Sequence, residues 1–421
     1  MVRRRLARRR GVRGWDTVST YPARAVVDLA AIRHNVRTLG ERAPGAAVMA
    51  VVKADAYGHG LVPSARAALA GGATWLGVAQ ATEALALRAA GVGPDDARVL
   101  TWLHVPGVDF AALLEADVDV SVAAPWAVDD VVAAARATGR TARVHLKVDT
   151  GLGRNGVMAE DVDSVLPALL KAEAEGTVRL VGLWSHLALA DEPDHPSVRA
   201  QRVVFDDVLE HAERAGARLE VRHLANSAAT LTAPELHYDL VRPGLAVYGM
   251  SPVPQLASPG DLGLVPAMTL EADLATVKRV RAGQGVSYAH LYTTTQDTAL
   301  GIVPLGYADG IPRHASGGSA GPGGPVLVGP DDAARVVRIA GRVCMDQVVL
   351  DLGPDTTERA GDTVRLFGVD EPLLGGGTAP TAQDWADAAD TISYEITTRL
   401  GSRIPRVHVD TEDRVSRAEN A

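Results

Sequence analysis

The stretch AVMAVVKADAYGHG, residues 47–60, contains the pattern on which the prediction of both fold and chemistry depends. Its first six residues are all apolar, as in a strand that is buried on both faces of a parallel sheet. Lys53 ends this run, and a small polar turn containing Tyr57 follows. An ammonium group at the end of a buried strand costs free energy unless it is paired, deprotonated or used covalently. Lys53 is therefore a candidate for covalent chemistry, and an ion pair with Asp55 is the alternative explanation.

Further apolar, β-rich runs follow this first one, and helix-like segments separate most of them. The runs are 74–79, 97–102, 118–123, 142–148, 178–185, 219–225 and 239–249. Apolar strands that alternate with amphipathic helices predict a parallel sheet covered on both faces. Eight such units in about 240 residues predict an α/β fold of the closed (β/α)8 TIM barrel type. An open doubly wound sheet is the alternative, although no Gly-x-Gly-x-x-Gly motif follows the first strand.

The character of the sequence changes after residue 263, where short strand-like runs are separated by Gly- and Pro-rich turns with few helices. This pattern predicts a mainly β second domain. The arginine-rich start of the chain is typical of a disordered arm. We therefore expect a disordered basic extension over 1–22, a (β/α)8 barrel over 23–263 and a β-rich C-terminal domain over 264–415.

Composition narrows the class of protein. The 421 residues carry a formal net charge of −9, which argues against nucleic acid as the main partner, because phosphate binding requires a clustered positive surface. No apolar run approaches the roughly 20 residues that span a bilayer. The single cysteine, Cys344, excludes an intrachain disulfide and is typical of a reducing compartment such as the cytoplasm.

Candidate site residues gather where the predicted barrel strands end, because the carboxyl ends of the strands form the reactive face of such a barrel. Beyond Lys53, they are Lys147, Arg154, His186, Asn226, Ser227, Arg242, Gly244 and Leu245. Structural explanations compete with functional ones. The structural explanation for His186 is that of a hydrogen-bonded core residue. For Asn226 or Ser227 it is a helix cap, and for Arg242 it is an ion pair.

A lysine used covalently forms a Schiff base with a carbonyl, either of a substrate or of pyridoxal phosphate. The neighbouring residues favour the phosphate-bearing cofactor. A helix start at Ser227 and the turn at Gly244 and Leu245 offer backbone N–H donors to an anion, and Tyr57 adds a hydroxyl. TIM barrels commonly bind phosphate in this region, near strands seven and eight.

Eight segments of the chain resemble, in order and spacing, the motifs of bacterial alanine racemase, a fold-type III pyridoxal-phosphate enzyme. They are VVKADAYGHG, HLKVDTGLGRNG, WSHLALAD, NSAAT, VRPGLAVYG, GVSYAHLYTT, GRVCMDQ and SYEITTRLGSRIPR. The resemblance covers residues 23–410. It implies a barrel followed by a β-domain, pyridoxal 5'-phosphate as cofactor and a homodimer whose active sites are shared between chains. The implied activity is the interconversion of L- and D-alanine, which supplies D-alanine for peptidoglycan.

The resemblance also assigns expected roles to individual residues. Lys53 matches the lysine that carries the cofactor and serves as one base, and Tyr288, from the other subunit, matches the second base. Arg154 and the backbone amide of Met345 match contacts to the substrate carboxylate, and Asp346 follows. Arg242 matches the arginine that faces the pyridine nitrogen, with His186 linked to it. The expected phosphate ligands are Tyr57, Ser227, Gly244, Leu245 and Tyr394, with Asn226 beside them. Lys147 matches a lysine that is carbamylated in many members, and no metal site is expected.

Two other functions compete with this interpretation. A racemase of another small amino acid such as serine, or a related decarboxylase, would share the lysine chemistry. A non-catalytic pyridoxal-phosphate-binding barrel would lack the second domain and therefore Tyr288. The segments GVSYAH and GRVCMDQ favour racemisation over decarboxylation, and the predicted second domain argues against the non-catalytic barrel.

Overall fold

The apolar runs of the sequence form a ring of parallel strands in the computed structural model, which describes residues 21–319 and 321–411. The strands of the ring follow one another in the order β10-β2-β3-β4-β5-β6-β8-β9, and each pairing between neighbours is parallel. They are β2 (Ala47–Val51), β3 (Trp75–Val78), β4 (Arg98–Thr101), β5 (Asp119–Val122), β6 (Ala142–Asp149), β8 (Val178–Trp184), β9 (Val221–His223) and β10 (Leu240–Val241). A two-residue strand, β7 (Val157–Met158), pairs with the end of β6.

The ring closes because the last strand returns to the first. Leu240 and Val241 of β10 pair with Ala47 and Val48 of β2. Backbone hydrogen bonds bridge β9 and β10 on either side: the Asp239 N–H donates to the Arg222 carbonyl at 3.1 Å, and the Arg242 N–H donates to the Ala225 carbonyl at 2.9 Å. The predicted barrel is therefore confirmed, and the open doubly wound alternative is wrong.

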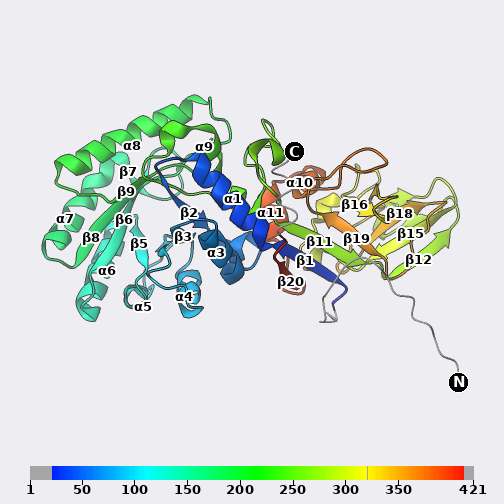
Figure 1. Cartoon of the computed structure of the whole chain (residues 1–421), viewed down its shortest axis with the longest axis horizontal. Coiled ribbons are helices and arrows are strands. Elements are labelled where there is room, and N and C mark those ends of the chain that lie inside the picture. The colour runs from blue at the N-terminus through cyan, green and yellow to red at the C-terminus, as the bar shows by residue number, and fades with distance from the viewer. Residues whose placement is uncertain (1–20, 320, 412–421) are drawn as a thin grey trace, which may run out of the picture.

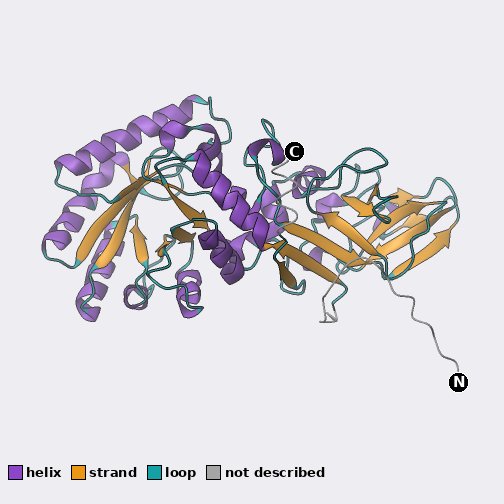
Figure 2. Cartoon of the chain, viewed as in Figure 1, coloured by secondary structure: helices purple, strands orange, loops and turns teal. Residues whose placement is uncertain are grey.

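Helices cover the outside of the ring (Figure 2). They are α1 (Leu29–Arg42), α3 (Leu61–Ala70), α4 (Ala81–Ala89), α5 (Phe110–Glu115), α6 (Pro125–Thr138), α7 (Leu166–Ala174), α8 (Pro196–Arg214) and α9 (Ser227–Thr232). Local sequence sets their limits. Helix α6, for example, begins with Pro125, whose missing N–H costs nothing in the first turn, and ends at Gly139, which adopts a left-handed conformation.

The second domain is built mainly from strands, as predicted. Its largest sheet has the order β17-β16-β19-β11-β1-β20, beside a three-stranded sheet β12-β15-β18 and the hairpin β13-β14. The bounds are β11 (Met268–Asp273), β12 (Thr276–Val280), β13 (Gly285–Val286), β14 (Tyr292–Thr293), β15 (Thr298–Val303), β16 (Pro325–Val328), β17 (Arg335–Arg338), β18 (Val348–Gly353), β19 (Thr363–Phe367) and β20 (Arg406–Val409). Helices α10 (Ala382–Ala389) and α11 (Ser393–Thr398) lie between β19 and β20 in the chain.

Strand β1 (Ala23–Asp28) corrects the expected domain limits. It lies within the range predicted for the barrel, but it pairs antiparallel with β11 and parallel with β20, inside the sheet of the second domain. Helix α1 then carries the chain across to the barrel (Figure 1). A strand followed by a helix resembles a barrel unit in sequence, and only the pairing partners reveal the difference. Of the basic extension expected over 1–22, residues 1–20 lie outside the described part of the chain.

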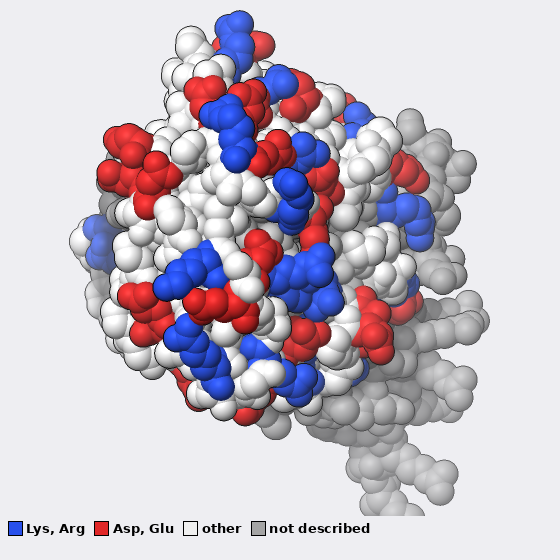
Figure 3. Space-filling view, turned by 90° about the vertical axis from the view of Figure 1, so that its left-hand side faces the viewer, with Lys and Arg blue, Asp and Glu red and all other residues white. Residues whose placement is uncertain are grey.

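Surface charge shows no single sign on the barrel face at the left of Figure 1, where acidic and basic side chains are interspersed (Figure 3). Such a surface does not offer nucleic acid the continuous basic patch that it binds. Among residues 21–319 and 321–411, none of the helices combines the length and apolarity needed to cross a membrane.

Candidate active site

A cavity of about 370 Å3 opens at the carboxyl ends of the barrel strands. Eleven of the residues singled out in the sequence lie in its wall, although they are spread over more than 340 positions of the chain. They are Lys53, Tyr57, Lys147, Arg154, His186, Asn226, Ser227, Arg242, Gly244, Leu245 and Tyr394. Barrel strands and the loops after them supply most of these residues, and α11 of the second domain supplies Tyr394.

The turn after Lys53 has an unusual backbone. Ala54, Asp55, Ala56 and Tyr57 all have φ between 53° and 55°, so this short segment, α2 (Lys53–Tyr57), is a left-handed turn. Left-handed conformation costs about 1–2 kcal/mol for each such residue. Hydrogen bonds hold the turn: the Ala54 N–H donates to Glu83 Oε1 at 2.6 Å, and the Leu61 N–H donates to Asp55 Oδ1 at 2.7 Å.

This geometry removes the ion-pair explanation for Lys53. The Asp55 carboxylate accepts a backbone hydrogen bond from Leu61. Among the described residues, the ion pairs within 4.0 Å do not include one between Lys53 and Asp55. Burial is the main cause that lowers the pKa of Lys53, and the nearby Arg154 lowers it further. Lys53 is thus shifted toward the neutral amine, the form that attacks a carbonyl carbon.

Four basic side chains, those of Lys53, Lys147, Arg154 and Arg242, converge on the cavity. None of the described residues in its wall is an aspartate or glutamate. Burial, and then the charges of Arg242 and Arg154, lower the pKa of Lys147 to about 7. Uncompensated buried cations are costly, typically several kcal/mol each. The cavity is therefore electrostatically suited to a ligand that carries more than one negative charge.

Arg242 is anchored at the inner end of the cavity. Its Nη2 donates to the Ser185 carbonyl at 2.7 Å and to the Leu224 carbonyl at 3.2 Å, and its Nη1 donates to His223 Nδ1 at 3.4 Å. Burial lowers the pKa of Arg242 to about 9, which leaves it a cation at neutral pH. The resemblance links His186 to this arginine, whereas the imidazole hydrogen-bonded to it is that of His223.

His186 lies in the cavity wall and is a neutral neighbour of the arginines. Burial, and then the charge of Arg242, hold its pKa well below the usual value. His223 was not predicted as a site residue. Its only signal in the sequence is its position as the last residue of a barrel strand, three residues before Asn226.

The loop that presents Arg154 is organised by Asp149, another residue that the sequence analysis missed. The Asp149 carboxylate accepts hydrogen bonds from the backbone N–H groups of Gly151, Leu152, Gly153 and Arg154, at 2.9–3.1 Å. Burial raises the pKa of Asp149, but these four donors outweigh it and hold the pKa below its usual value. The loop is therefore rigid around an ionised carboxylate.

Small and hydroxyl-bearing residues occupy the opposite end of the cavity. Ser227 Oγ accepts hydrogen bonds from the N–H groups of Gly244 at 2.8 Å and Ala246 at 3.3 Å. A Cβ at Gly244 would lie 2.9 Å from Tyr57 Cζ and still closer to the Tyr57 hydroxyl, so only glycine allows this approach. Burial raises the pKa of both Tyr57 and Tyr394, the latter to about 12, so both phenols can donate hydrogen bonds.

Asn226 acts here as the cap of α9, because its side-chain oxygen accepts from the Ala229 N–H at 3.1 Å. The structural explanation considered for this residue therefore holds. Its position in the cavity wall is a second, independent property.

Tyr288, Met345 and Asp346 lie on the second domain and are not among the described residues of the cavity wall. Tyr288 is 72% exposed and Met345 is 53% exposed, while Asp346 forms an ion pair with Arg403 at 2.9 Å. Two loops carry these residues side by side: Ser287 Oγ lies 3.2 Å from Cys344 Sγ and donates to the Arg342 carbonyl at 2.8 Å. One chain alone thus does not bring Tyr288 to Lys53.

The backbone around Tyr288 is strained in the same way as the Lys53 turn. Ser287, Ala289 and His290 have φ of 62°, 60° and 42°. Residues held in such conformations cost about 1–3 kcal/mol each and cluster at functional sites. An exposed tyrosine on a segment of this kind is a candidate for contact with another molecule.

Comparisons with known proteins match both domains of the chain. The family models for the N-terminal and C-terminal domains of alanine racemase match residues 27–252 and 267–408. Alanine racemase of Beutenbergia cavernae is 59% identical over 394 residues, which cover 94% of this chain and 100% of that protein. The alanine racemase of Streptomyces coelicolor is 58% identical over 397 residues, which cover 94% and 98%.

Solved structures extend the agreement to the fold. The crystal structure of alanine racemase from Streptomyces lavendulae, which produces D-cycloserine, superposes with a TM-score of 0.88 at 55% identity, covering 94% of this chain and 99% of that one. For the Streptomyces coelicolor structure the TM-score is 0.87 at 58% identity, with 93% and 98% covered. With both domains matched in order and nearly the whole length shared, the chain belongs to the alanine racemase family.

Proposed function

We propose that this chain interconverts L-alanine and D-alanine with pyridoxal phosphate bound in the cavity at the barrel mouth, and that it supplies D-alanine for peptidoglycan in the cytoplasm of its cell. The observation that carries the proposal is the half-buried lysine amine of Lys53, which faces a cavity lined by cations and, among the described wall residues, by no carboxylate. A phosphate and an amino-acid carboxylate are anions of the kind that such a cavity requires.

The residues present fit this cofactor. When bound, pyridoxal phosphate supplies an aldehyde carbon that links to amines and a ring that withdraws electrons from the substrate α-carbon. Lys53 would hold it covalently, and Arg242 would face its ring nitrogen, with His186 nearby. The phosphate would lie at the other end, against the hydroxyls of Tyr57, Ser227 and Tyr394 and the backbone of Gly244 and Leu245, beside Asn226. The close approach of Gly244 to Tyr57, and the hydrogen bond from the Gly244 N–H to Ser227 Oγ, bring three of these groups together.

Racemisation requires a proton to leave one face of the α-carbon and a proton to arrive at the opposite face. In our proposal Lys53 Nζ exchanges the proton on one face and Tyr288 Oη exchanges it on the other. Lys53 would deprotonate the D enantiomer and Tyr288 the L enantiomer. The lowered pKa of Lys53, caused first by burial and then by Arg154, makes this amine a base closer to neutral pH.

In this proposal a second copy of the chain supplies Tyr288, which is exposed and is not among the described wall residues of the cavity in its own chain. We therefore propose a homodimer in which Tyr288 and Met345 of each copy complete the cavity of the other. The substrate carboxylate would lie between Arg154 of one copy and the Met345 backbone amide of the other. Asp346, next to Met345, is held by Arg403 and would keep this loop in place.

Lys147 is the candidate for carbamylation. Its Nζ lies 4.2 Å from the centre of the Trp184 ring, and its pKa of about 7 leaves a large share of free amine, the form that reacts with CO2. A carbamate would replace a cation by an anion beside Arg154 and Arg242, and it would relieve the like-charge repulsion of this cluster.

The decisive experiment measures D-alanine formed from L-alanine by the purified protein. Tyr288→Phe should keep the cofactor absorbance and lose racemisation, because it removes a proton-transfer group and leaves the cavity unchanged. Tyr292→Phe is the matched control, since it removes a hydroxyl that donates to Asp351 on the same domain. Reduction with borohydride should then fix the cofactor on Lys53. Absence of racemisation in the wild type, or fixation at another residue, would refute the proposal.

Mixing two inactive variants tests the shared site. Lys53→Ala and Tyr288→Phe are dissociated, mixed and reassociated, so that hybrid dimers combine an intact Lys53 from one copy with an intact Tyr288 from the other. If sites are shared, activity recovers to about a quarter of the wild-type value, because half the dimers are hybrid and each has one intact site. Sites built within one chain predict no recovery.

A further inference from the structure

A chain of buried hydrogen bonds runs through the interior of the barrel from the cavity toward its opposite end. It begins at Arg242 Nη1, which lies 3.4 Å from His223 Nδ1. His223 Nε2 lies 3.0 Å from His145 Nδ1, and His145 Nε2 lies 3.3 Å from Asp119 Oδ2. Asp119, His145 and His223 have no exposed surface, and Arg242 is 5% exposed. A cation at the reactive face is thus connected to a carboxylate at the first residue of β5.

Two features show that the barrel is built around this chain. Gly182 of β8 lies between the strands that carry the two histidines, and a Cβ there would lie 2.8 Å from His145 Cε1 and closer still to His145 Nδ1. Its φ is not in the left-handed region, so space for the imidazole is the reason for glycine. The His223 ring stacks on Trp184 with an interplanar angle of 5°, and Trp75 packs edge-on against His145.

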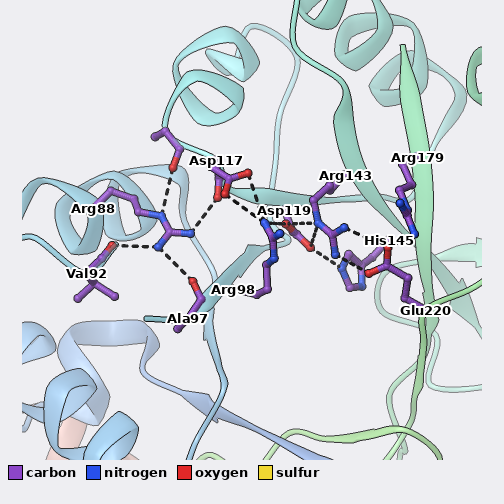
Figure 4. Close-up of polar contacts among 11 residues, drawn as sticks. Arg88, Val92, Ala97, Arg98, Asp117, Asp119, Arg143, His145, Arg179 and Glu220 are labelled. Atoms are coloured by element: carbon purple, nitrogen blue, oxygen red, sulfur yellow. Dashed lines mark hydrogen bonds and ion pairs between the residues drawn. The ribbon is translucent and has the colours of Figure 1, made fainter. Parts of the chain in front are cut away.

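Groups at the far end hold Asp119 in place (Figure 4). Arg143 Nε donates to both Asp119 oxygens, at 3.1 and 3.2 Å, and Arg98 lies 4.0 Å away. Arg143 also pairs with Glu220, at 2.8 Å. The carboxylate is therefore fixed by guanidinium groups on one side and faces His145 on the other.

The two ends of the chain determine where its protons lie. A guanidinium group only donates, so His223 Nδ1 has to be the acceptor, and the proton of this neutral imidazole is on Nε2. That N–H donates to His145 Nδ1, which leaves the His145 proton on Nε2, pointing at Asp119. The Asp119 carboxylate only accepts, so it requires the same arrangement. Burial, and then the charge of Arg242, hold the pKa of His223 well below its usual value, which agrees with a neutral ring.

We propose that Asp119 is a positioning residue for the racemase reaction: through His145 and His223 it presents a hydrogen-bond acceptor to Arg242 and so fixes the guanidinium that faces the cofactor ring. The inference rests on the proposed function for its catalytic consequence, although the proton arrangement can be measured independently. Asp119 touches neither substrate nor cofactor, and its influence passes through two imidazoles.

The wild-type protein provides the first test. Imidazole 15N NMR of the purified, histidine-labelled protein distinguishes protonated from unprotonated ring nitrogens, and His145→Gln and His223→Gln identify the two spin systems. We expect both rings to be neutral with the proton on Nε2. A proton on Nδ1 of either ring would overturn the proposal. This result does not depend on any measurement of turnover, so it separates failure of the inference from failure of the proposed function.

Asp119→Asn provides the second test. An amide can donate to His145 Nε2, which would reverse both tautomers and turn the His223 Nδ1–H toward a donor of Arg242. We expect kcat to fall about 10- to 100-fold, the usual effect of removing a partner that orients a functional group, with KM for alanine little changed. Transamination should increase relative to racemisation, because a displaced Arg242 would no longer keep the ring nitrogen unprotonated and the ring would withdraw electrons more strongly.

Asp117→Asn is the matched control. Asp117 lies two residues away from Asp119, pairs with Arg98 at 3.1 Å and takes no part in the hydrogen bonds that link Asp119 to Arg242. Its φ of 51° also suits asparagine. We expect it to keep the wild-type tautomers and kcat. Wild-type tautomers and kcat in Asp119→Asn would overturn the proposal, as would an equal loss of kcat in Asp117→Asn. If Asp119→Asn does not fold, the histidine tautomers measured in the wild-type protein test the proposal on their own.

Discussion

Gly244→Ala tests how closely the residues around Tyr57 are packed. The added methyl would lie 2.9 Å from Tyr57 Cζ, whereas carbon atoms pack at about 3.5–4.0 Å, so the ring has to retreat by about 0.6–1.1 Å. Tyr57 is only 7% exposed and packs against Tyr248 and Tyr394, with ring centroids 5.1 and 6.1 Å apart. Overpacking of this kind costs about 1–3 kcal/mol of unfolding free energy.

The same displacement should weaken cofactor binding. A hydrogen bond to a charged group is worth about 1.5–3 kcal/mol, and moving the Tyr57 hydroxyl by about 1 Å removes it. At 1.4 kcal/mol for each factor of ten, Kd for pyridoxal phosphate should rise about 10- to 100-fold. Urea denaturation measures the first effect, and absorbance titration of the cofactor measures the second.

Two variants serve as controls for this prediction. Gly260→Ala adds the same methyl where the nearest atom, Ser258 Oγ, is 3.9 Å away, and it should leave both quantities unchanged. Tyr57→Phe removes the atom with the worst overlap, so the double variant with Gly244→Ala should recover part of the lost stability. The steric reasoning is wrong if Gly244→Ala unfolds like the wild type, or if the double variant shows no recovery.

Three further predictions concern groups that hold the site in place. Burial lowers the pKa of Lys147 to about 7 in the folded state, against about 10.5 in the unfolded chain, so the unfolded chain binds more protons between these pH values and the stability of the wild type rises with pH there. Lys147→Met should therefore be more stable than the wild type at pH 7, and the difference should shrink by pH 10, as measured by urea denaturation in bicarbonate-free buffer. Asp149→Ala leaves four backbone N–H groups without their acceptor, so it should lower unfolding free energy by about 1–3 kcal/mol and raise KM for alanine through Arg154; an unchanged KM would contradict this. Arg406→Ala removes the donor to the Gly58 carbonyl at 2.9 Å, so faster hydrogen exchange in the Lys53 turn is expected, and unaltered exchange would show that other contacts suffice.

Much of the fold follows from local pattern. Every predicted barrel run contains an observed strand, because strands buried on both faces leave a long apolar signal that does not depend on their partners. Helix α10 also begins at a local signal, because the capping box of Thr381 and Asp384 is complete within four residues. Residues 23–28 were included in the barrel range for the opposite reason: the partners of β1 lie more than 240 residues away in sequence, and nothing local shows which sheet it joins.

The residues of the candidate site also differ in whether a local sequence pattern could predict them. Residues at strand ends, such as Lys53 and Arg242, could be predicted because topology places all strand ends at one mouth. His145 and His223 could not, because a buried histidine in an apolar strand gives no sign of the ring it meets on another strand. Tyr288 entered only through the resemblance, since its exposed position in the single chain gives it no partner that a pattern could reveal.

The pairing of β1 with β11 and β20 makes the second domain discontinuous, with the barrel inserted between its first strand and the remainder. During synthesis, Val27 leaves the ribosome 241 residues before its partner Met268, so an open strand edge persists while the barrel is already complete. Cutting the gene between the two domains would not yield independent halves. Two fragments divided at residue 263 would instead have to recombine, one contributing a strand to the other, as in donor-strand complementation.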